Sequence, residues 1–237
     1  MPKRRSCTDC AVRSSALCRA LSAQHLADLN RHSHQKRYPP GQLLAGFDAA
    51  QDWFAIIVSG VIKLTKSLPD GRQQIVALLF PSDSLGCPFG PSGSHTAETA
   101  TAVELCCFSR QYFEVLMHDQ PELKQQFLER TLDELERARD WMLRLGRGTA
   151  QEKLAAFMLL MWRRMCVPEC AFCARPQAQQ FDLPLTRSEM GDYLGLRIET
   201  VSRQLKALQA AGAIETERGR TISVRDAQVL ERLTNRE

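Results

Sequence analysis

The residues of this sequence best suited to chemistry are its cysteines, of which there are nine among 237 residues. Cys7, Cys10 and Cys18 stand close to the N-terminus in a C-x2-C-x7-C pattern. A two-residue spacer lets the backbone curl until two thiolates converge on one centre, which suits zinc or an iron–sulfur cluster. Idle thiols can share this spacing, but the third cysteine and the basic residues around it favour a metal centre. A fourth ligand must come from elsewhere in the chain.

A second group of cysteines, Cys166, Cys170 and Cys173, forms a C-x3-C-x2-C pattern. These thiols could bind zinc or act as a redox switch, and a variable loop with spare cysteines is the alternative. The sequence has no run of about 18 apolar residues, and its N-terminus lacks the apolar stretch of a signal peptide. We therefore predict a cytoplasmic protein with no membrane partner, whose cysteines serve metal or redox chemistry rather than disulfide bonds.

Residues 185–214 have the spacing of a helix-turn-helix. Thr186 and Glu189 are placed to form a capping box at the start of the first helix. Gly195 supplies the positive φ that ends this helix, and a second helix is expected over residues 197–211. The buried stripe of the second helix consists of Val201, Leu205 and Leu208.

The other face of this second helix carries polar residues near its start: Arg197, Glu199, Thr200, Ser202, Arg203 and Lys206. An ordinary surface helix also has a polar face. The short glycine turn, the crowding of polar groups and the turn-and-strand pattern from Arg218 to Val224, which indicates a wing, favour a helix that reads DNA bases. The net charge of +4 permits DNA binding without requiring it, so specificity must come from the placement of the side chains.

Other elements must position these two segments. From Arg37 to Phe108, short apolar or alternating runs are separated by Gly- and Pro-rich turns, which predicts a double-sheet β-roll. Its last strand is expected over residues 99–108, and Ser109 is expected to cap the helix that follows. The sequence thus predicts an α+β fold with a Cys-rich arm (1–20), a β-roll domain (21–119), a dimerisation helix (120–146) and a winged helix-turn-helix domain (147–237).

The long helix carries an apolar heptad seam, which predicts a parallel homodimer. The seam consists of Leu128, Thr131, Leu135, Ala138, Met142 and Leu145. A helix packed on its own sheet would need a similar stripe. The additional apolar residues Phe127, Leu132 and Trp141 favour a helix that contacts both a partner helix and its own domain. Gly146 and Gly148 are expected to interrupt the helix and act as a hinge.

These parts resemble the superfamily of the cyclic-AMP receptor protein and the fumarate–nitrate reduction regulator (CRP/FNR) over essentially the whole length. The match is carried by the N-terminal cysteines, SGVIKL at 59–64, QEKLAAF at 151–157 and GDYLGLRIETVSRQL at 191–205. Within them, Glu199, Ser202 and Arg203 match the family's E-x-x-S-R base-reading motif. The chain is most similar to the FNR branch, whose members sense oxygen with a [4Fe–4S] cluster.

The resemblance implies a [4Fe–4S] cofactor held by four thiolates: Cys7, Cys10, Cys18 and Cys106. Cys106 is included because the family's fourth ligand lies in the last strand before the helices. Cys107 would point to the opposite face of that strand, and Cys87 is a weaker candidate. The resemblance also implies a near-palindromic operator in double-stranded DNA with TTGAT-type half-sites. RNA polymerase is the implied partner, contacted through surface loops such as Leu68 to Gln73.

Two features of this chain depart from the family. The arm spacing exceeds the C-x2-C-x5-C of the best-known member, and Ala138 stands where some members place a carboxylate in the dimer seam. An apolar seam should dimerise more readily. The family's nucleotide pocket uses a Glu for the ribose and an Arg for the phosphate. Here Cys87 replaces the Glu and no Arg occurs between Arg72 and Arg110, so no cyclic nucleotide is expected to bind.

The competing interpretation is a constitutive, or thiol- or zinc-responsive, DNA-binding dimer without an iron–sulfur sensor, since zinc is redox-silent. An enzyme is not expected, because no Ser/His/Asp set, phosphate-binding loop or dinucleotide fingerprint is visible. The sequence therefore predicts a homodimeric transcription regulator of anaerobic or microaerobic gene expression, acting as activator or repressor according to operator position.

Overall fold

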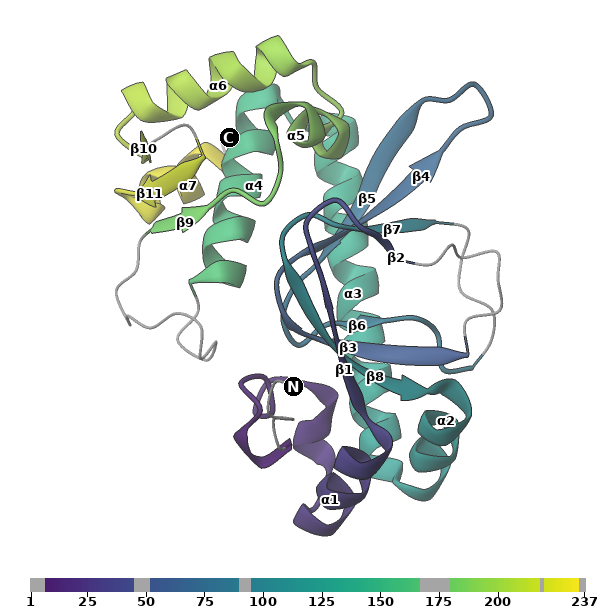
Figure 1. The fold of residues 1–237 in the computed structure, drawn as a ribbon. Coiled ribbons are helices and arrows are strands. Elements are labelled where there is room, and N and C mark those ends of the chain that lie inside the picture. Colours follow the sequence, from purple (N-terminus) through teal and green to yellow (C-terminus); the bar gives the residue numbers. More distant parts are fainter. Residues whose placement is uncertain (1–6, 45–51, 90–94, 167–179, 218–219, 235–237) are drawn as a thin grey trace. The chain divides into compact units, whose positions relative to one another are not determined.

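The computed structural model describes residues 7–44, 52–89, 95–166, 180–217 and 220–234 (Figure 1). The fold is α+β, as predicted, with antiparallel sheets in both halves of the chain. The chain divides into two compact units, residues 1–133 and 134–237, and the boundary lies inside one long helix. Within the described ranges, no helix is long and apolar enough to cross a membrane.

The first unit contains two four-stranded antiparallel sheets, in the orders β1-β8-β3-β6 and β2-β7-β4-β5. Their strands are β1 (His34–Tyr38), β2 (Leu43–Leu44), β3 (Trp53–Ser59), β4 (Ile62–Ser67), β5 (Gln73–Leu79), β6 (Ser84–Leu85), β7 (Thr96–Thr99) and β8 (Val103–Ser109). This arrangement confirms the double-sheet β-roll.

Strand β3 lies between two apolar cores, because successive side chains of a strand point to opposite faces. Phe54, Ile56 and Val58 belong to a core shared with the N-terminal arm and with helix α2 (Arg110–Asp119). Ala55 and Ile57 face the interior of the roll, together with apolar residues of both sheets. The arm is therefore packed onto the outer face of sheet β1-β8-β3-β6.

The prediction of a single strand over residues 99–108 is wrong. The chain turns at residues 100–102, between β7 and β8. In this turn the Ala100 amide donates to the Val61 carbonyl at 2.9 Å. Gly60 leaves room for this turn, since a Cβ at Gly60 would lie 2.2 Å from the Ala102 carbonyl oxygen. The apolar run itself gives no sign of the turn, because the space is made by a glycine elsewhere in the chain.

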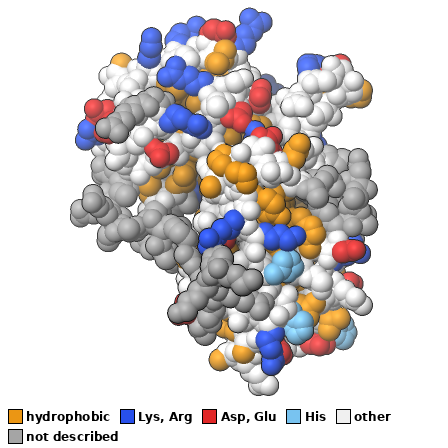
Figure 2. Space-filling model, viewed as in Figure 1, with side chains coloured by type: hydrophobic (Ala, Val, Ile, Leu, Met, Phe, Trp, Pro, Cys, Tyr) orange, Lys and Arg blue, Asp and Glu red, His pale blue; other side chains and the backbone are white. Residues whose placement is uncertain are grey.

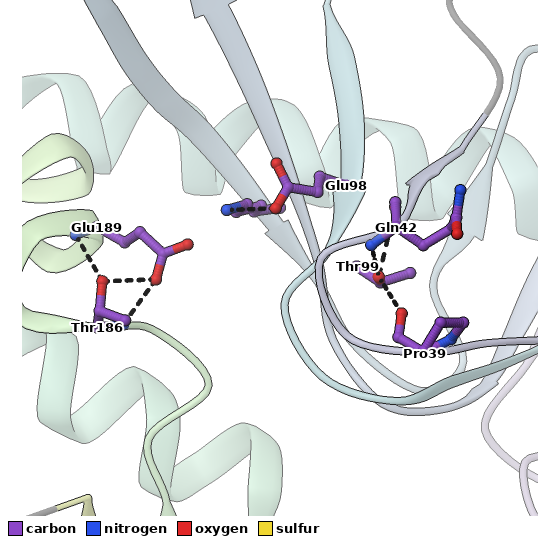
Figure 3. Close-up of polar contacts among 7 residues, drawn as sticks. Pro39, Gln42, Glu98, Thr99, Thr186 and Glu189 are labelled. Atoms are coloured by element: carbon purple, nitrogen blue, oxygen red, sulfur yellow. Dashed lines mark hydrogen bonds and ion pairs between the residues drawn. The ribbon is translucent and has the colours of Figure 1, made fainter.

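Polar contacts hold the chain before β2 against β7 (Figure 3). The Thr99 hydroxyl donates to the Pro39 carbonyl at 2.6 Å, and its oxygen accepts from the Gln42 amide at 2.8 Å. Nearby, Lys63 of β4 and Glu98 of β7 form an ion pair at 2.9 Å. These contacts satisfy polar groups at the edge of the second sheet, where the ladder is short.

Helices cover the outer face of sheet β1-β8-β3-β6. They are the 3-10 turns η1 (Cys7–Asp9) and η2 (Leu17–Ala20), helix α1 (Ala23–His32) and α2. Ser109 caps α2 as predicted, since its hydroxyl accepts from the Tyr112 amide at 3.1 Å. Helix α1 begins at Ala23, because Ser22 is its N-cap and its hydroxyl accepts from the His25 amide.

The longest helix, α3 (Pro121–Arg147), begins in the first unit and ends in the second. The predicted interruption at Gly146 is wrong, because Gly146 is helical. One glycine destabilises a helix by only about 1 kcal/mol relative to alanine, so the neighbouring residues keep it helical. The helix ends before Gly148, where a Cβ would lie 2.7 Å from the Arg144 carbonyl oxygen.

The second unit is built on helix α4 (Ala150–Met165), seven of whose sixteen residues are buried. The other elements are β9 (Gln180–Asp182), α5 (Arg187–Leu194), α6 (Ile198–Ala210), β10 (Ile214–Glu217), β11 (Thr221–Val224) and α7 (Ala227–Thr234). Helices α6 and α7 pack on α4, and the strands form a sheet in the order β10-β11-β9. Tyr193 stacks on Trp141 with ring centroids 4.9 Å apart, which joins α5 to the end of α3.

Candidate nucleic-acid interface and cysteine site

The helix-turn-helix depends on three local features. Thr186 and Glu189 form the predicted capping box: the Glu189 amide donates to the Thr186 hydroxyl (3.2 Å), and the Thr186 amide donates to the Glu189 carboxylate (2.7 Å; Figure 3). Gly195 ends α5 with a φ of 63°. Gly191 allows the turn to approach closely, since a Cβ there would lie 2.5 Å from the Leu196 carbonyl oxygen. Together they set where α6 begins relative to α5.

Helix α6 has an apolar and a polar face, as predicted. Val201, Leu205 and Leu208 are buried in the unit's core. The predicted DNA-binding residues are exposed or half-buried: Arg197, Glu199, Thr200, Ser202, Arg203 and Lys206. The Ser202 hydroxyl lies 3.5 Å from Arg187 Nη1 of α5 and accepts a hydrogen bond from it. Because the apolar face of α6 packs in the core, its polar face lies at the surface of the unit.

A shallow hollow on this face is lined by Ile198, Glu199, Ser202, Arg203 and Lys206. Ile198 was missed by the sequence reasoning, although it is the first residue of α6 and 45% exposed. In helices that read DNA, an apolar side chain among polar ones contacts the methyl group of thymine. The available signal was its position directly before Glu199 and off the buried stripe.

Basic side chains gather at the α6 edge of this unit (Figure 2). Such groups supply the phosphate contacts that orient a protein on DNA, whereas the base-edge contacts determine sequence preference. Strands β10 and β11 pair beside α6 as a wing. Two residues of the predicted wing, 218 and 219, lie outside the described residues.

Four of the cysteines lie against one apolar core. Cys7, Cys10 and Cys18 of the arm and Cys106 of β8 are half-buried and pack on the core that contains Phe54. They come from η1, the turn after it, η2 and the last strand of the roll. The fold thus brings the three arm thiols and the expected fourth thiol to the same face of β8.

Strand alternation separates Cys106 from its neighbour. Cys107 is 1% exposed and lies in the interior of the roll, among the apolar residues on the other face of β8. Burial raises the pKa of Cys107 to about 11, although the positive charge of Lys36 acts to lower it. Cys87, which follows β6, is half-buried and belongs to neither group of packed residues.

The four thiols influence one another electrostatically. Burial raises the pKa of the Cys18 thiol to about 12, with further contributions from Cys7 and Cys10, while Arg130 acts in the opposite direction. Burial, and then the three arm thiols, also raise the pKa of Cys106. Cys18 and Cys106 therefore resist ionising unless a cationic centre compensates their charge.

Of the second cysteine group, only Cys166 lies within the described residues. Cys166, at the end of α4, lies 3.7 Å from the Gln180 carbonyl oxygen, to which its thiol donates. Cys170 and Cys173 lie outside the described residues, so the predicted second thiol or metal site stays a prediction.

Helix α3 exposes an apolar stripe that includes much of the predicted dimer seam. The exposed residues are Leu128, Leu132, Leu135, Met142 and Leu143, each between 44% and 66% exposed. Thr131 and Ala138 are also exposed, and Leu145 is half-buried. By contrast, Phe127 faces its own unit, since the centroids of its ring and of the Phe54 ring are 6.3 Å apart. An apolar stripe of this kind on a soluble helix is typical of an interface between helices.

Comparison with known proteins agrees with this geometry. Residues 35–120 match the cyclic nucleotide-binding domain, and residues 152–233 match the Crp-like helix-turn-helix domain. The chain is 42% identical over 226 residues to the transcriptional activator protein FnrL of Cereibacter sphaeroides, covering 95% of this chain and 90% of that protein. It is 36% identical over 213 residues to the nitrogen fixation regulation protein FixK of Bradyrhizobium diazoefficiens, covering 90% and 87%.

Among solved structures, FixK2 from Bradyrhizobium japonicum superposes with a TM-score of 0.76 at 32% identity, covering 86% of this chain and 98% of that one. The Crp-like helix-turn-helix domain, shared with these transcription regulators, makes the chain a DNA-binding transcription regulator. The chain belongs to the Crp/Fnr family, in its FNR and FixK branch.

Proposed function

We propose that the chain regulates anaerobic or microaerobic gene expression through an oxygen-labile [4Fe–4S] cluster held by four thiolates: Cys7, Cys10, Cys18 and Cys106. The observation that carries this proposal is the packing of those four thiols against one core. A [4Fe–4S] cluster takes one thiolate on each iron, so its ligands stand farther apart than those of a single ion. Within the described ranges, no group of three or more His, Cys, Asp or Glu side chains is placed to hold a single metal ion.

When bound, the cluster supplies an oxygen-reactive centre whose irons stabilise the thiolates. The chain's own residues prepare that environment. The apolar core partly shields Cys18 and Cys106 from water, and Arg130 places positive charge near Cys18. Thiols with raised pKa values stay protonated at neutral pH, so ligand binding would release protons and depend on pH.

On DNA, we infer that two copies of α6 enter successive major grooves about 34 Å apart, which requires a near-palindromic operator with TTGAT-type half-sites. Arg203 would donate two hydrogen bonds to a guanine. Glu199 would accept a hydrogen bond from the amino group of a cytosine or an adenine, and Ser202 would contact an adjacent base edge. Arg197, Thr200 and Lys206 would bind the phosphate backbone.

The exposed stripe of α3 supports a parallel homodimer, since pairing two copies would cover apolar side chains that one chain leaves in water. The hairpin between β4 and β5 is the surface loop we assign to RNA polymerase. Its tip carries Leu68, which is 52% exposed, and an Asp70–Arg72 ion pair at 2.8 Å.

We also infer that the roll binds no cyclic nucleotide. Its described interior is lined by aliphatic residues such as Ile57, Ile62 and Leu105, with Cys107 among them. A cyclic phosphate enclosed there would lose its hydration without gaining a counter-charge, which is strongly unfavourable.

The proposal is tested by the absorption spectrum of protein purified without oxygen and read again after exposure to air, with iron and zinc measured on the same sample. We expect a broad visible band that bleaches in air and about four irons per chain. Cys106→Ala should remove the band, and the adjacent Cys107→Ala is the matched control that should retain it. A colourless protein with about one zinc would contradict the cluster and leave a DNA-binding dimer without this sensor.

A further inference from the structure

Arg130 of α3 joins three segments that are distant in the sequence. Its Nη1 donates to the Ser82 carbonyl at 3.0 Å, in the turn between β5 and β6. Its Nη2 donates to the Ser15 carbonyl, in the arm between Cys10 and Cys18. One guanidinium therefore bridges the dimerisation helix, the β-roll and the cysteine arm of the first unit.

The two carbonyl groups are themselves held together. The hydroxyls of Ser15 and Ser82 lie 2.6 Å apart and share a hydrogen bond. Ser82 adopts a φ of 80°, which a non-glycine residue rarely does, and its amide donates to the Ile57 carbonyl at 2.9 Å. The Ser15 end is anchored by the neighbouring Ala16, which is fully buried. Contacts other than those with Arg130 therefore hold both acceptor carbonyls in place.

The chemistry of the side chain suits this position. A guanidinium is planar, always charged and able to donate in two directions at once, whereas a lysine ammonium acts as a point charge. Its hydrogen bonds to carbonyls are charge-assisted and partly shielded from water, so they are stronger than exposed ones. Along α3, Arg130 stands between Leu128 and Leu132 of the exposed apolar stripe. Arg130, which contacts the arm, is therefore on the same two helical turns as Leu128 and Leu132, which are expected to contact a partner.

We propose that Arg130 is a positioning residue that ties the cysteine arm to α3, so that the order of the arm and the placement of the dimer stripe are coupled. The bridge to the arm stands on the contacts above, and the coupling to a dimer rests on the proposed function. Coupling is reciprocal: whatever orders the arm favours the α3 position that Arg130 bridges, and dimerisation favours an ordered arm.

Hydrogen exchange of the full-length, cluster-free chain tests the bridge. The variant is Arg130→Met, which keeps an unbranched apolar stem and removes every donor. The control is Arg137→Met, one heptad later on α3, where the described residues show no hydrogen bond or ion pair to the side chain. We expect amides of residues 11–20 to exchange roughly tenfold faster or more in Arg130→Met, as for the loss of hydrogen bonds to a charged group, and at the wild-type rate in Arg137→Met.

Equal exchange of the arm in the two variants would overturn the bridge. If Arg130→Met instead loosened the whole β-roll, Arg130→Lys decides, because it keeps the charge and cannot span both carbonyls. Faster exchange confined to the arm in Arg130→Lys supports the bridge, and wild-type exchange there overturns it.

The coupling is tested by the dimer dissociation constant of the same cluster-free samples, measured by sedimentation. We expect a several-fold increase in Arg130→Met relative to Arg137→Met, and equal constants would overturn the coupling. Neither measurement requires iron. A chain that never takes up a cluster would therefore contradict the proposed function while these two results still decide the role of Arg130.

Discussion

At the scale of single residues, function in this chain follows from which side of an element a side chain lies on. Cys106 and Cys107 are neighbours in β8, yet one meets the arm and the other the interior of the roll. On α6, Arg203 is exposed while Val201 and Leu205 are buried. Chemically equivalent or adjacent residues thus acquire different roles because the strand and helix periods send them to different environments.

Replacing Arg203 tests base reading. Arg203→Ala should weaken binding to the cognate operator by roughly 1–3 kcal/mol, because a bidentate contact to guanine is lost, and should change binding to scrambled DNA little. The measurement is fluorescence anisotropy with both duplexes at one fixed salt concentration. Lys206→Ala is the control, and we expect it to weaken both complexes alike. An equal loss on both duplexes for Arg203→Ala would show that it binds phosphate only.

At the scale of elements, the helix-turn-helix is determined by short-range chemistry and by one close approach. The capping box of Thr186 and Glu189 and the left-handed Gly195 define the two ends of α5. Gly191 has a different role, since its missing side chain admits the Leu196 carbonyl. Gly146 is the contrasting case, because it is helical and a Cβ there would meet nothing within 4 Å.

The two glycines should therefore respond in opposite directions to alanine. Gly191→Ala should lower the free energy of unfolding by about 1–3 kcal/mol, because the added carbon overlaps backbone. Gly146→Ala should raise it by about 0.5–1 kcal/mol, because alanine favours the helix. Denaturant unfolding followed by circular dichroism measures both. Stabilisation by Gly191→Ala would mean that α5 and the turn are not packed as described.

At the scale of the whole molecule, regulation depends on what α3 joins. The helix runs from the unit that holds Cys7, Cys10, Cys18 and Cys106 into the unit that holds α6, and it exposes an apolar stripe along the way. In the proposed function, a signal at the arm would change DNA binding by changing this helix or its pairing, since two copies of α6 would engage the two half-sites of one operator.

A charge in the stripe should break the pairing. Leu135→Glu should raise the dimer dissociation constant roughly 10- to 100-fold, since two carboxylates would be buried face to face. Operator affinity should fall with it. Val115→Glu is the control, because Val115 is 54% exposed on α2, outside the stripe. Sedimentation measures the mass, and a Leu135→Glu chain that stays dimeric would place the interface elsewhere.

The sequence by itself determined the features that depend on residues within one or two turns of each other. The caps at Ser109 and Thr186, the turn at Gly195 and the two faces of α6 were all predictable, because each follows from local hydrogen bonding or from helical period. The short runs between Gly- and Pro-rich turns predicted the β-roll, and family resemblance added Cys106 as the expected fourth thiol. By contrast, the three-residue strand β9 and the eight-residue helix α7 were not predicted.

Tertiary structure alone decided the features that need partners far along the chain. The break between β7 and β8 depends on the space at Gly60, and the meeting of Cys106 with the arm depends on packing across one face of a sheet. Arg130 contacts Ser15 and Ser82, which precede it by 115 and 48 residues. Contacts at such separations leave no trace in local pattern, because they form only once the chain has closed around a common core.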